Sequence, residues 1–138
     1  DAFACNNSGL ASGVIASLEL EGLASTEKIF VAGSDADLKN VRYIVQGKQV
    51  IDVWKKIDPL AFKAAEIAVE IARNPNKSIE SIAKEASQGD LRFAMVDNGF
   101  TKVPTVVTPV VPITKDNIDS TLIAEKVFSR EEVYGEKK

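Results

Sequence analysis

Three polar side chains of different chemistry each follow a short apolar run of the chain. Asn7, Asp35 and Lys55 carry an amide, a carboxylate and an ammonium group. Together these groups can donate hydrogen bonds to, and accept them from, the hydroxyls of a small polyhydroxylated molecule. They do not form a recognisable catalytic set. The three residues are therefore candidates for binding a ligand without changing it.

The apolar runs before these residues predict the elements that would position them. Residues 1–6, 28–33 and 49–54 have the composition of short buried strands, and the segments between them are amphipathic. The order strand–helix–strand–helix–strand is typical of right-handed βαβ units in a parallel sheet. Ligands of open α/β sheets bind outside the carboxyl ends of the strands. The three side chains are expected to meet at that edge.

The remainder of the chain is predicted to be more helical and then less regular. Asp58 followed by Pro59 is a helix start, with aspartate as N-cap and proline at the first helical position. That helix is expected to end at Arg73, and a second helix is expected over residues 78–87. Residues 89–102 show little periodicity. The last elements are an extended segment at 102–113, where three prolines argue against a regular central strand, a helix within 117–128 and a charged tail.

Composition argues against several other kinds of chemistry. The 138 residues include no histidine and one cysteine, Cys5, so cysteine–histidine and serine–histidine pairs are impossible within the chain. No cluster of side chains has the spacing of a zinc site. The net charge of -3 offers no basic patch for nucleic acid. No apolar run reaches the roughly 18–20 residues that cross a bilayer. We expect a binding protein, not an enzyme, without a metal or other cofactor.

Several segments form a set that resembles a known family. They are DAFACNN at 1–7, VAGSDAD at 31–37, VWK at 53–55 and AAEIAV at 64–69, followed in order by Asn98-Gly99, Val103-Pro104, Thr108-Pro109 and Asn117-Ile118. In this order they resemble the carboxyl-terminal half of bacterial D-xylose-binding proteins, and glucose-binding homologues share the same framework. The resemblance covers nearly the whole chain.

The resemblance implies a fold and a function. The fold is α/β, a parallel-sheet, three-layer α/β/α lobe of the type I periplasmic-binding-protein fold. The function is binding of a monosaccharide, D-xylose or D-glucose, by Asn7, Asp35 and Lys55, as the substrate-receptor component of an ABC sugar transporter. The location is extracytoplasmic, in the periplasm or as a lipoprotein of the cell surface.

The resemblance also implies how the chain is divided and what it contacts. Residues 1–55 would form the carboxyl-terminal lobe, 56–108 the hinge crossing and elements that pack on a missing amino-terminal lobe, and 109–138 the return and tail. The partners would be the sugar, the amino-terminal lobe and an ABC permease or membrane sensor, with no nucleic acid. An alanine-rich helix face without its natural sheet would also favour a homodimer.

Other interpretations of the same residues are open. Asn7 can serve only as a cap of the following helix, and Asp35 with Asp37 also resembles a short Asp-x-Asp metal motif. Trp54 is expected to pack near the hinge, because strand alternation directs it away from the side that Lys55 faces. Ser8 stands where family members commonly have an aspartate.

Two other functions are compatible with the pattern. The effector-binding domain of a lactose-repressor-type regulator, or of a sugar sensor, shares the implied fold. A receiver- or flavodoxin-like switch is the other, but it requires an acidic cluster or a glycine-rich phosphate loop. Asp35, Asp37 and Lys55 imitate the receiver cluster poorly, and no such loop is present.

Overall fold

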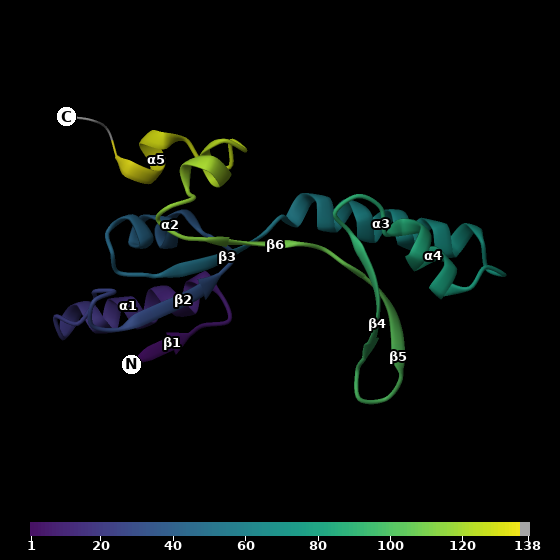
Figure 1. Cartoon of the computed structure of the whole chain (residues 1–138), viewed down its shortest axis with the longest axis horizontal. Coiled ribbons are helices and arrows are strands. Elements are labelled where there is room, and N and C mark those ends of the chain that lie inside the picture. The colour runs from purple at the N-terminus through teal and green to yellow at the C-terminus, as the bar shows by residue number, and fades with distance from the viewer. Residues whose placement is uncertain (136–138) are drawn as a thin grey trace. The chain divides into compact units, whose positions relative to one another are not determined.

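The computed structural model describes residues 1–135, and their internal contacts divide the chain into two units. The first unit contains Asp1–Lys55 together with the described residues from Val111 onward. The second unit is Lys56–Val110. Each unit has its own sheet and its own helices (Figure 1).

The first unit is built on a four-stranded sheet in the order β1-β2-β3-β6. The first three strands pair in parallel, with Ala2 opposite Phe30 and Gly33 opposite Asp52. Figure 1 shows the chain running along the fourth strand against the direction of its neighbour, so the sheet is mixed. The strands are β1 (Ala2–Ala4), β2 (Phe30–Ser34), β3 (Ile51–Lys55) and β6 (Val110–Ile113).

Two helices cover one face of this sheet. They are α1 (Ser8–Leu20) and α2 (Leu38–Val45), and each connects two neighbouring parallel strands. Two right-handed crossovers that advance in the same direction place both helices on the same side. α1 packs on β2 through a buried cluster of Ala11, Ile15, Leu18 and Val31. The predicted βαβαβ order is therefore present, with shorter strands than the sequence suggests.

The opposite face of the sheet has no helix from the described residues of this unit packed on it. Side chains alternate along a strand, so Phe30 and its register partner Ala2 lie on that face. Phe30 is 58% exposed, although its neighbour Val31 on the helix side is fully buried. The α/β lobe is confirmed, and the chain itself supplies two of the three expected layers.

The last part of the first unit packs against α2. A short π-helix, Asp119–Ile123, and α5 (Arg130–Tyr134) contribute Ile118, Leu122 and Val133 to a buried cluster with Val41 and Ile44 of α2. α5 begins with a capping box in which Ser129 and Glu132 each bond the other's backbone N–H. The sequence placed a helix within 117–128 and only a tail beyond it, so α5 was missed.

The second unit combines two helices with a β-hairpin. Its elements are α3 (Ile57–Arg73), α4 (Ile79–Ala86), β4 (Arg92–Asp97) and β5 (Lys102–Val107). α3 begins at Ile57 after Lys56, and Asp58 lies in its first turn, so the prediction of Asp58 as N-cap was wrong. Ser78 caps α4, because its side chain accepts a hydrogen bond from the backbone N–H of Ser81.

The hairpin was not predicted from the sequence, which shows little periodicity over residues 89–102. β4 and β5 pair antiparallel, and Pro104 of β5 lies opposite Met95. A two-stranded sheet has only edge strands, where a proline is tolerated. The prolines therefore exclude a central strand without excluding a hairpin.

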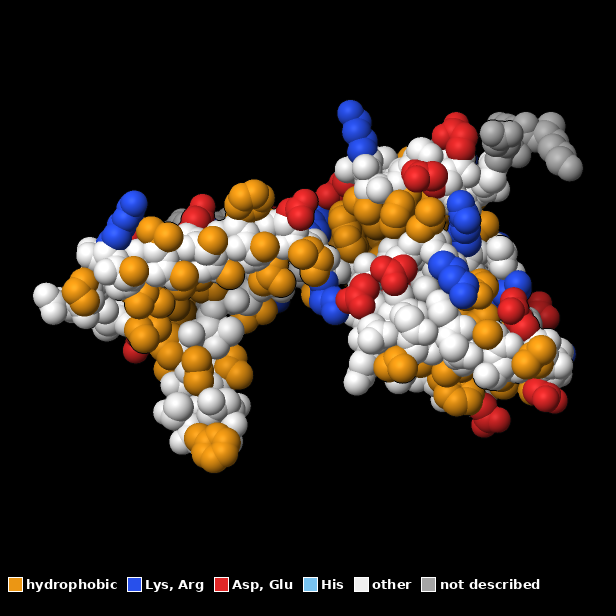
Figure 2. Space-filling model, turned by 180° about the vertical axis from the view of Figure 1, so that it is seen from behind, with side chains coloured by type: hydrophobic (Ala, Val, Ile, Leu, Met, Phe, Trp, Pro, Cys, Tyr) orange, Lys and Arg blue, Asp and Glu red, His pale blue; other side chains and the backbone are white. Residues whose placement is uncertain are grey.

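Few side chains of the second unit are buried. Ile82 and Ala83 of α4 belong to the core, whereas α3 contains no buried residue. Figure 2 shows hydrophobic side chains along the surface of this unit. The large hydrophobic residues that are exposed here include Ile57, Leu60, Phe62, Val69 and Phe100.

Candidate functional site

Asp35 and Lys55 meet at the carboxyl edge of the sheet. The Lys55 ammonium lies 2.6 Å from Asp35 Oδ1, and the two side chains are 40% and 39% exposed. Lys55 is the last residue of β3, and Asp35 follows β2 directly. A carboxylate has two oxygens and an ammonium has three N–H donors, so one ion pair leaves both groups with further bonding capacity.

Asn7 lies in the connection between β1 and α1, three residues after Ala4, and it makes a different interaction. It is the N-cap of α1, where its Oδ1 accepts a hydrogen bond of 2.8 Å from the backbone N–H of Leu10. The cap uses only the amide oxygen. The NH2 group of this exposed side chain is a donor that the cap does not use. Capping and ligand binding are therefore compatible at Asn7.

The turn that carries Asp35 has an uncommon backbone conformation. Asp35 and Ala36 have φ values of 107° and 57°, and only glycine adopts such values without steric cost. Two hydrogen bonds of 2.8 Å tie the turn to β3. The N–H of Asp35 donates to the Val53 carbonyl, and the N–H of Ala36 donates to Asp52 Oδ1.

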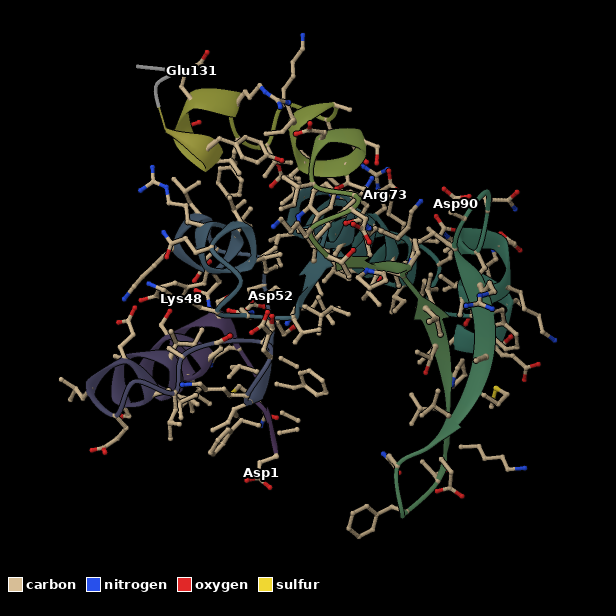
Figure 3. The ribbon with its side chains drawn as sticks, turned by 60° about the vertical axis from the view of Figure 1, so that its left-hand side comes forward. Asp1, Lys48, Asp52, Arg73, Asp90 and Glu131 are labelled. Atoms are coloured by element: carbon tan, nitrogen blue, oxygen red, sulfur yellow. The ribbon has the colours of Figure 1, made fainter. Side chains whose placement is uncertain are left out.

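Beneath this turn lies a buried polar cluster, formed by Ser8, Asn40, Gln49 and Asp52. Each of the four residues is at most 1% exposed. Asp52 Oδ2 accepts hydrogen bonds from Ser8 Oγ at 3.0 Å and from Gln49 Nε2 at 2.7 Å. Asn40 Nδ2 donates to Gln49 Oε1 and to the Ser8 carbonyl, both at 2.9 Å. Asp52 is labelled in Figure 3, where it lies among the elements of the first unit.

Glycine at position 33 is required for this cluster. A Cβ on Gly33 would lie 2.4 Å from Asp52 Oδ2 and 2.9 Å from Gln49 Nε2. Both distances are too short for real atoms, so only a hydrogen fits between β2 and the cluster. The glycine of the Gly33-Ser34-Asp35 segment therefore leaves room for a polar group beneath the site.

The cluster was missed by the sequence analysis, although a signal was present. Asp52 is a carboxylate between Ile51 and Val53 in a run that otherwise predicts a buried strand. A charge there needs several buried donors, which the sequence does not identify. Trp54, by contrast, was correctly assigned to packing, since it contacts the cluster that joins α2 to β6.

Other kinds of site are less well supported by the described part of the chain. No group of three or more His, Cys, Asp or Glu side chains among residues 1–135 is arranged to hold a metal ion. Within the same residues, no helix has both the length and the apolar character needed to cross a membrane. The groups whose pKa values are shifted lie away from the sheet edge. The Arg130 guanidinium and the Tyr134 hydroxyl lower the pKa of Asp119, and Glu85 with Glu70 raises that of Lys77.

Comparisons with known proteins agree with the resemblance seen in the sequence. No family model matches the chain. A D-xylose-binding periplasmic protein of Haemophilus influenzae is 35% identical over 134 residues, which are 97% of this chain and 36% of that protein. Its Escherichia coli counterpart is 30% identical over 133 residues, 96% of this chain and 36% of that protein.

A solved structure supports the same relationship. The carbohydrate transporter solute-binding protein of Chloroflexus aurantiacus, in complex with D-glucose, superimposes with a TM-score of 0.68 and 26% identity. The match covers 95% of this chain and 34% of that protein. The chain thus spans about a third of the length of these relatives. Over nearly all its residues, the chain is similar in sequence to the D-xylose-binding periplasmic proteins, and it has the α/β fold of type I periplasmic binding proteins.

Proposed function

We propose that this chain forms part of an extracytoplasmic receptor that binds D-xylose or D-glucose for an ABC transporter. The observation that carries the proposal is the open Asp35–Lys55 ion pair at the carboxyl edge of the sheet. The names of its homologues support a sugar as the ligand. The receptor would bind the sugar and release it unchanged, in the periplasm or at the cell surface.

Each of the three side chains has a definite task in this proposal. The Asp35 carboxylate accepts hydrogen bonds from two neighbouring sugar hydroxyls, and such charge-assisted bonds are among the stronger ones. The Lys55 ammonium donates to a hydroxyl or to the ring oxygen while it balances the charge of Asp35. Asn7 donates through the NH2 group that its helix cap leaves unused.

The remaining contacts to the sugar would come from an amino-terminal lobe outside this chain. Relatives that are about three times as long supply the length for such a lobe. The absence of any buried residue in α3 supports a missing partner for that helix. The lobes would close on the sugar by hinge bending, and an ABC permease or a membrane sensor would recognise the closed form.

Isothermal titration with D-xylose and D-glucose tests the proposal. We expect heat of binding from this chain mixed with the separately produced amino-terminal part, and little from the chain alone, because closure then cannot occur. Asp35→Ala should abolish the signal, because it removes a charged acceptor worth about 1.5–3 kcal/mol per bond.

Two results would contradict it. Tight binding by the chain alone would show that a second lobe is not needed. No binding by a mixture of folded components would favour a regulator or a switch. Analytical ultracentrifugation of the chain alone would show whether two copies cover each other's apolar faces instead.

A further inference from the structure

The carboxylate of Asp52 lies close to the proposed binding edge but cannot touch a ligand there. Asp52 is fully buried, and it belongs to the set of β3 side chains that faces the helices. Lys55 lies three residues further along, on the other side of the strand. Any influence of Asp52 on binding must therefore pass through the residues it contacts.

Three donors from three separate segments converge on this carboxylate. They are the hydroxyl of Ser8 at the start of α1, the amide of Gln49 before β3, and the backbone N–H of Ala36 in the turn after β2. The Ser8 oxygen accepts in turn from the backbone N–H of Asp37 at 3.2 Å. Asp52 and Ser8 together therefore bond two consecutive N–H groups of the turn that carries Asp35.

Backbone carbonyls determine which side-chain atoms of the cluster donate hydrogen bonds and which accept them. Gln49 Nε2 also donates to the Ile51 carbonyl at 3.0 Å, which fixes the orientation of its amide. Asn40 Nδ2 donates to the Ser8 carbonyl, and Asn40 Oδ1 accepts from Ser12 Oγ at 2.9 Å. Because the side-chain amides of Asn40 and Gln49 are fixed in orientation, an N–H of Gln49 points at the side chain of residue 52. That side chain must therefore provide a hydrogen-bond acceptor.

We propose that Asp52 is a positioning residue for the binding edge, and that it acts through the Ala36 N–H and through Ser8. These bonds hold Asp35 and Ala36 in a backbone conformation that their side chains disfavour. In that conformation the Asp35 carboxylate lies against Lys55. The effect on sugar affinity rests on the proposed function, whereas the effect on the turn can be measured without any sugar.

Asp52→Asn is the sharpest variant, because it keeps the shape and removes one acceptor. Either orientation of the new amide places an NH2 group against a donor, at Ala36 on one side or at Gln49 on the other. Ser8→Ala is a milder second variant that removes the bond to the Asp37 N–H. Asp116→Asn, which changes an exposed carboxylate of the same unit, is the matched control.

Two readouts are needed. Amide hydrogen exchange, followed by NMR on the 138-residue chain, reports on Ala36 and Asp37 relative to amides within α1. Titration with D-xylose and D-glucose, in the presence of the amino-terminal part, reports on affinity. In Asp52→Asn we expect the Ala36 amide to exchange about tenfold to hundredfold faster, because that change corresponds to the loss of one charged hydrogen bond. The affinity for the sugar should fall in parallel. Ser8→Ala should affect mainly the Asp37 amide, and Asp116→Asn neither.

Several outcomes would overturn the proposal. One is a folded Asp52→Asn chain whose Ala36 exchange is unchanged. Another is equal acceleration of all amides of the first unit, because that marks a general loss of stability. A third is a loosened turn with undiminished sugar affinity. If Asp52→Asn does not fold, the selective effect of Ser8→Ala decides. The wild-type mixture can also bind no sugar while the Ala36 amide of Asp52→Asn exchanges selectively faster. In that case the proposed function fails, and the positioning of the turn by Asp52 stands.

Discussion

The ion pair between Asp35 and Lys55 contributes little to the stability of the fold. Both side chains are about two-fifths exposed, and surface pairs of this kind are worth about 0–1 kcal/mol. The pair therefore adds little to stability, and both charges remain accessible for the ligand contacts proposed above.

This contrast leads to a prediction for Lys55→Met. We expect the free energy of unfolding to change by less than about 1 kcal/mol, because only a solvent-screened pair is lost. Sugar binding by the reconstituted lobes should fall below detection, because the donor to the ligand is gone. Chemical denaturation and isothermal titration measure the two quantities.

Lys48→Met is the matched control for this variant. Lys48 and Glu19 form an ion pair of 2.7 Å whose side chains are similarly exposed, on a different part of the same unit. Lys48→Met should have an equally small effect on stability and none on affinity. Equal losses of affinity in the two variants would remove Lys55 from the proposed site.

For individual residues, the sequence predicted the positions of those side chains that follow from the order of the strands. Asp35 and Lys55 could be brought together because the ends of neighbouring parallel strands meet at one edge. The hydrogen bonds of Asp52 could not be predicted, because they depend on donors from Ser8 and Gln49 that come together only when α1 and β3 are packed. The capping bond of Asn7 was foreseen as an alternative, and the structure contains it.

Among the elements, those with a clear period were predictable and those without one were not. β1, β2, β3, α1 and α2 follow from alternation between apolar runs and amphipathic segments. The hairpin of β4 and β5 was missed because its cross-strand pairing, such as Met95 with Pro104, produces no local pattern. α5 was missed because a five-residue helix is held mainly by its capping box and by Val133 in the core.

The π-helix and α5 are joined by polar contacts of Asp119 whose strength depends on pH. Asp119 accepts a hydrogen bond of 2.6 Å from Arg130 Nη1 and one of 2.8 Å from the Tyr134 hydroxyl. These contacts lower the pKa of Asp119 below its ordinary value of 3.8. A carboxylate whose pKa is lowered on folding stabilises the folded state above the unfolded value, and this contribution is lost as pH falls through the lowered value.

We therefore predict that Asp119→Asn reduces stability at neutral pH but not in strong acid. The difference in melting temperature between wild type and variant should shrink as pH falls below 3.8 and through the lowered pKa. Thermal denaturation followed by circular dichroism at several pH values measures it. Asp116→Asn, at an exposed position nearby, should show no such trend. If the difference in melting temperature is independent of pH, the charge of Asp119 is not the source of the stabilisation.

For the molecule as a whole, the two units differ in how much of their surface they bury. The first unit has two buried clusters, whereas the core residues of the second are Ile82 and Ala83. Conformational entropy opposes the ordering of every residue, so a unit with so little buried apolar surface has little to offset that cost. The assignment of this second unit to an amino-terminal lobe stays a prediction.

Amide exchange should show the difference between the units directly. We predict that amides of α3 exchange at least about tenfold faster than those of α1 in this chain alone, because local stability follows buried contact. Adding the separately produced amino-terminal part should slow the exchange of α3 and leave α1 nearly unchanged. If α3 is as protected as α1 without any partner, the second unit is stable by itself.

The chain leaves the first unit from β3 and returns to it on β6, and these two strands are neighbours that run in opposite directions (Figure 1). The end of β3 and the start of β6 therefore lie at the same end of this strand pair. The whole of Lys56–Val110 is in this sense an insertion between two ends that a tight turn can join. Replacing it with a turn sequence would give a miniature scaffold of under a hundred residues that keeps Asn7, Asp35 and Lys55 at its rim.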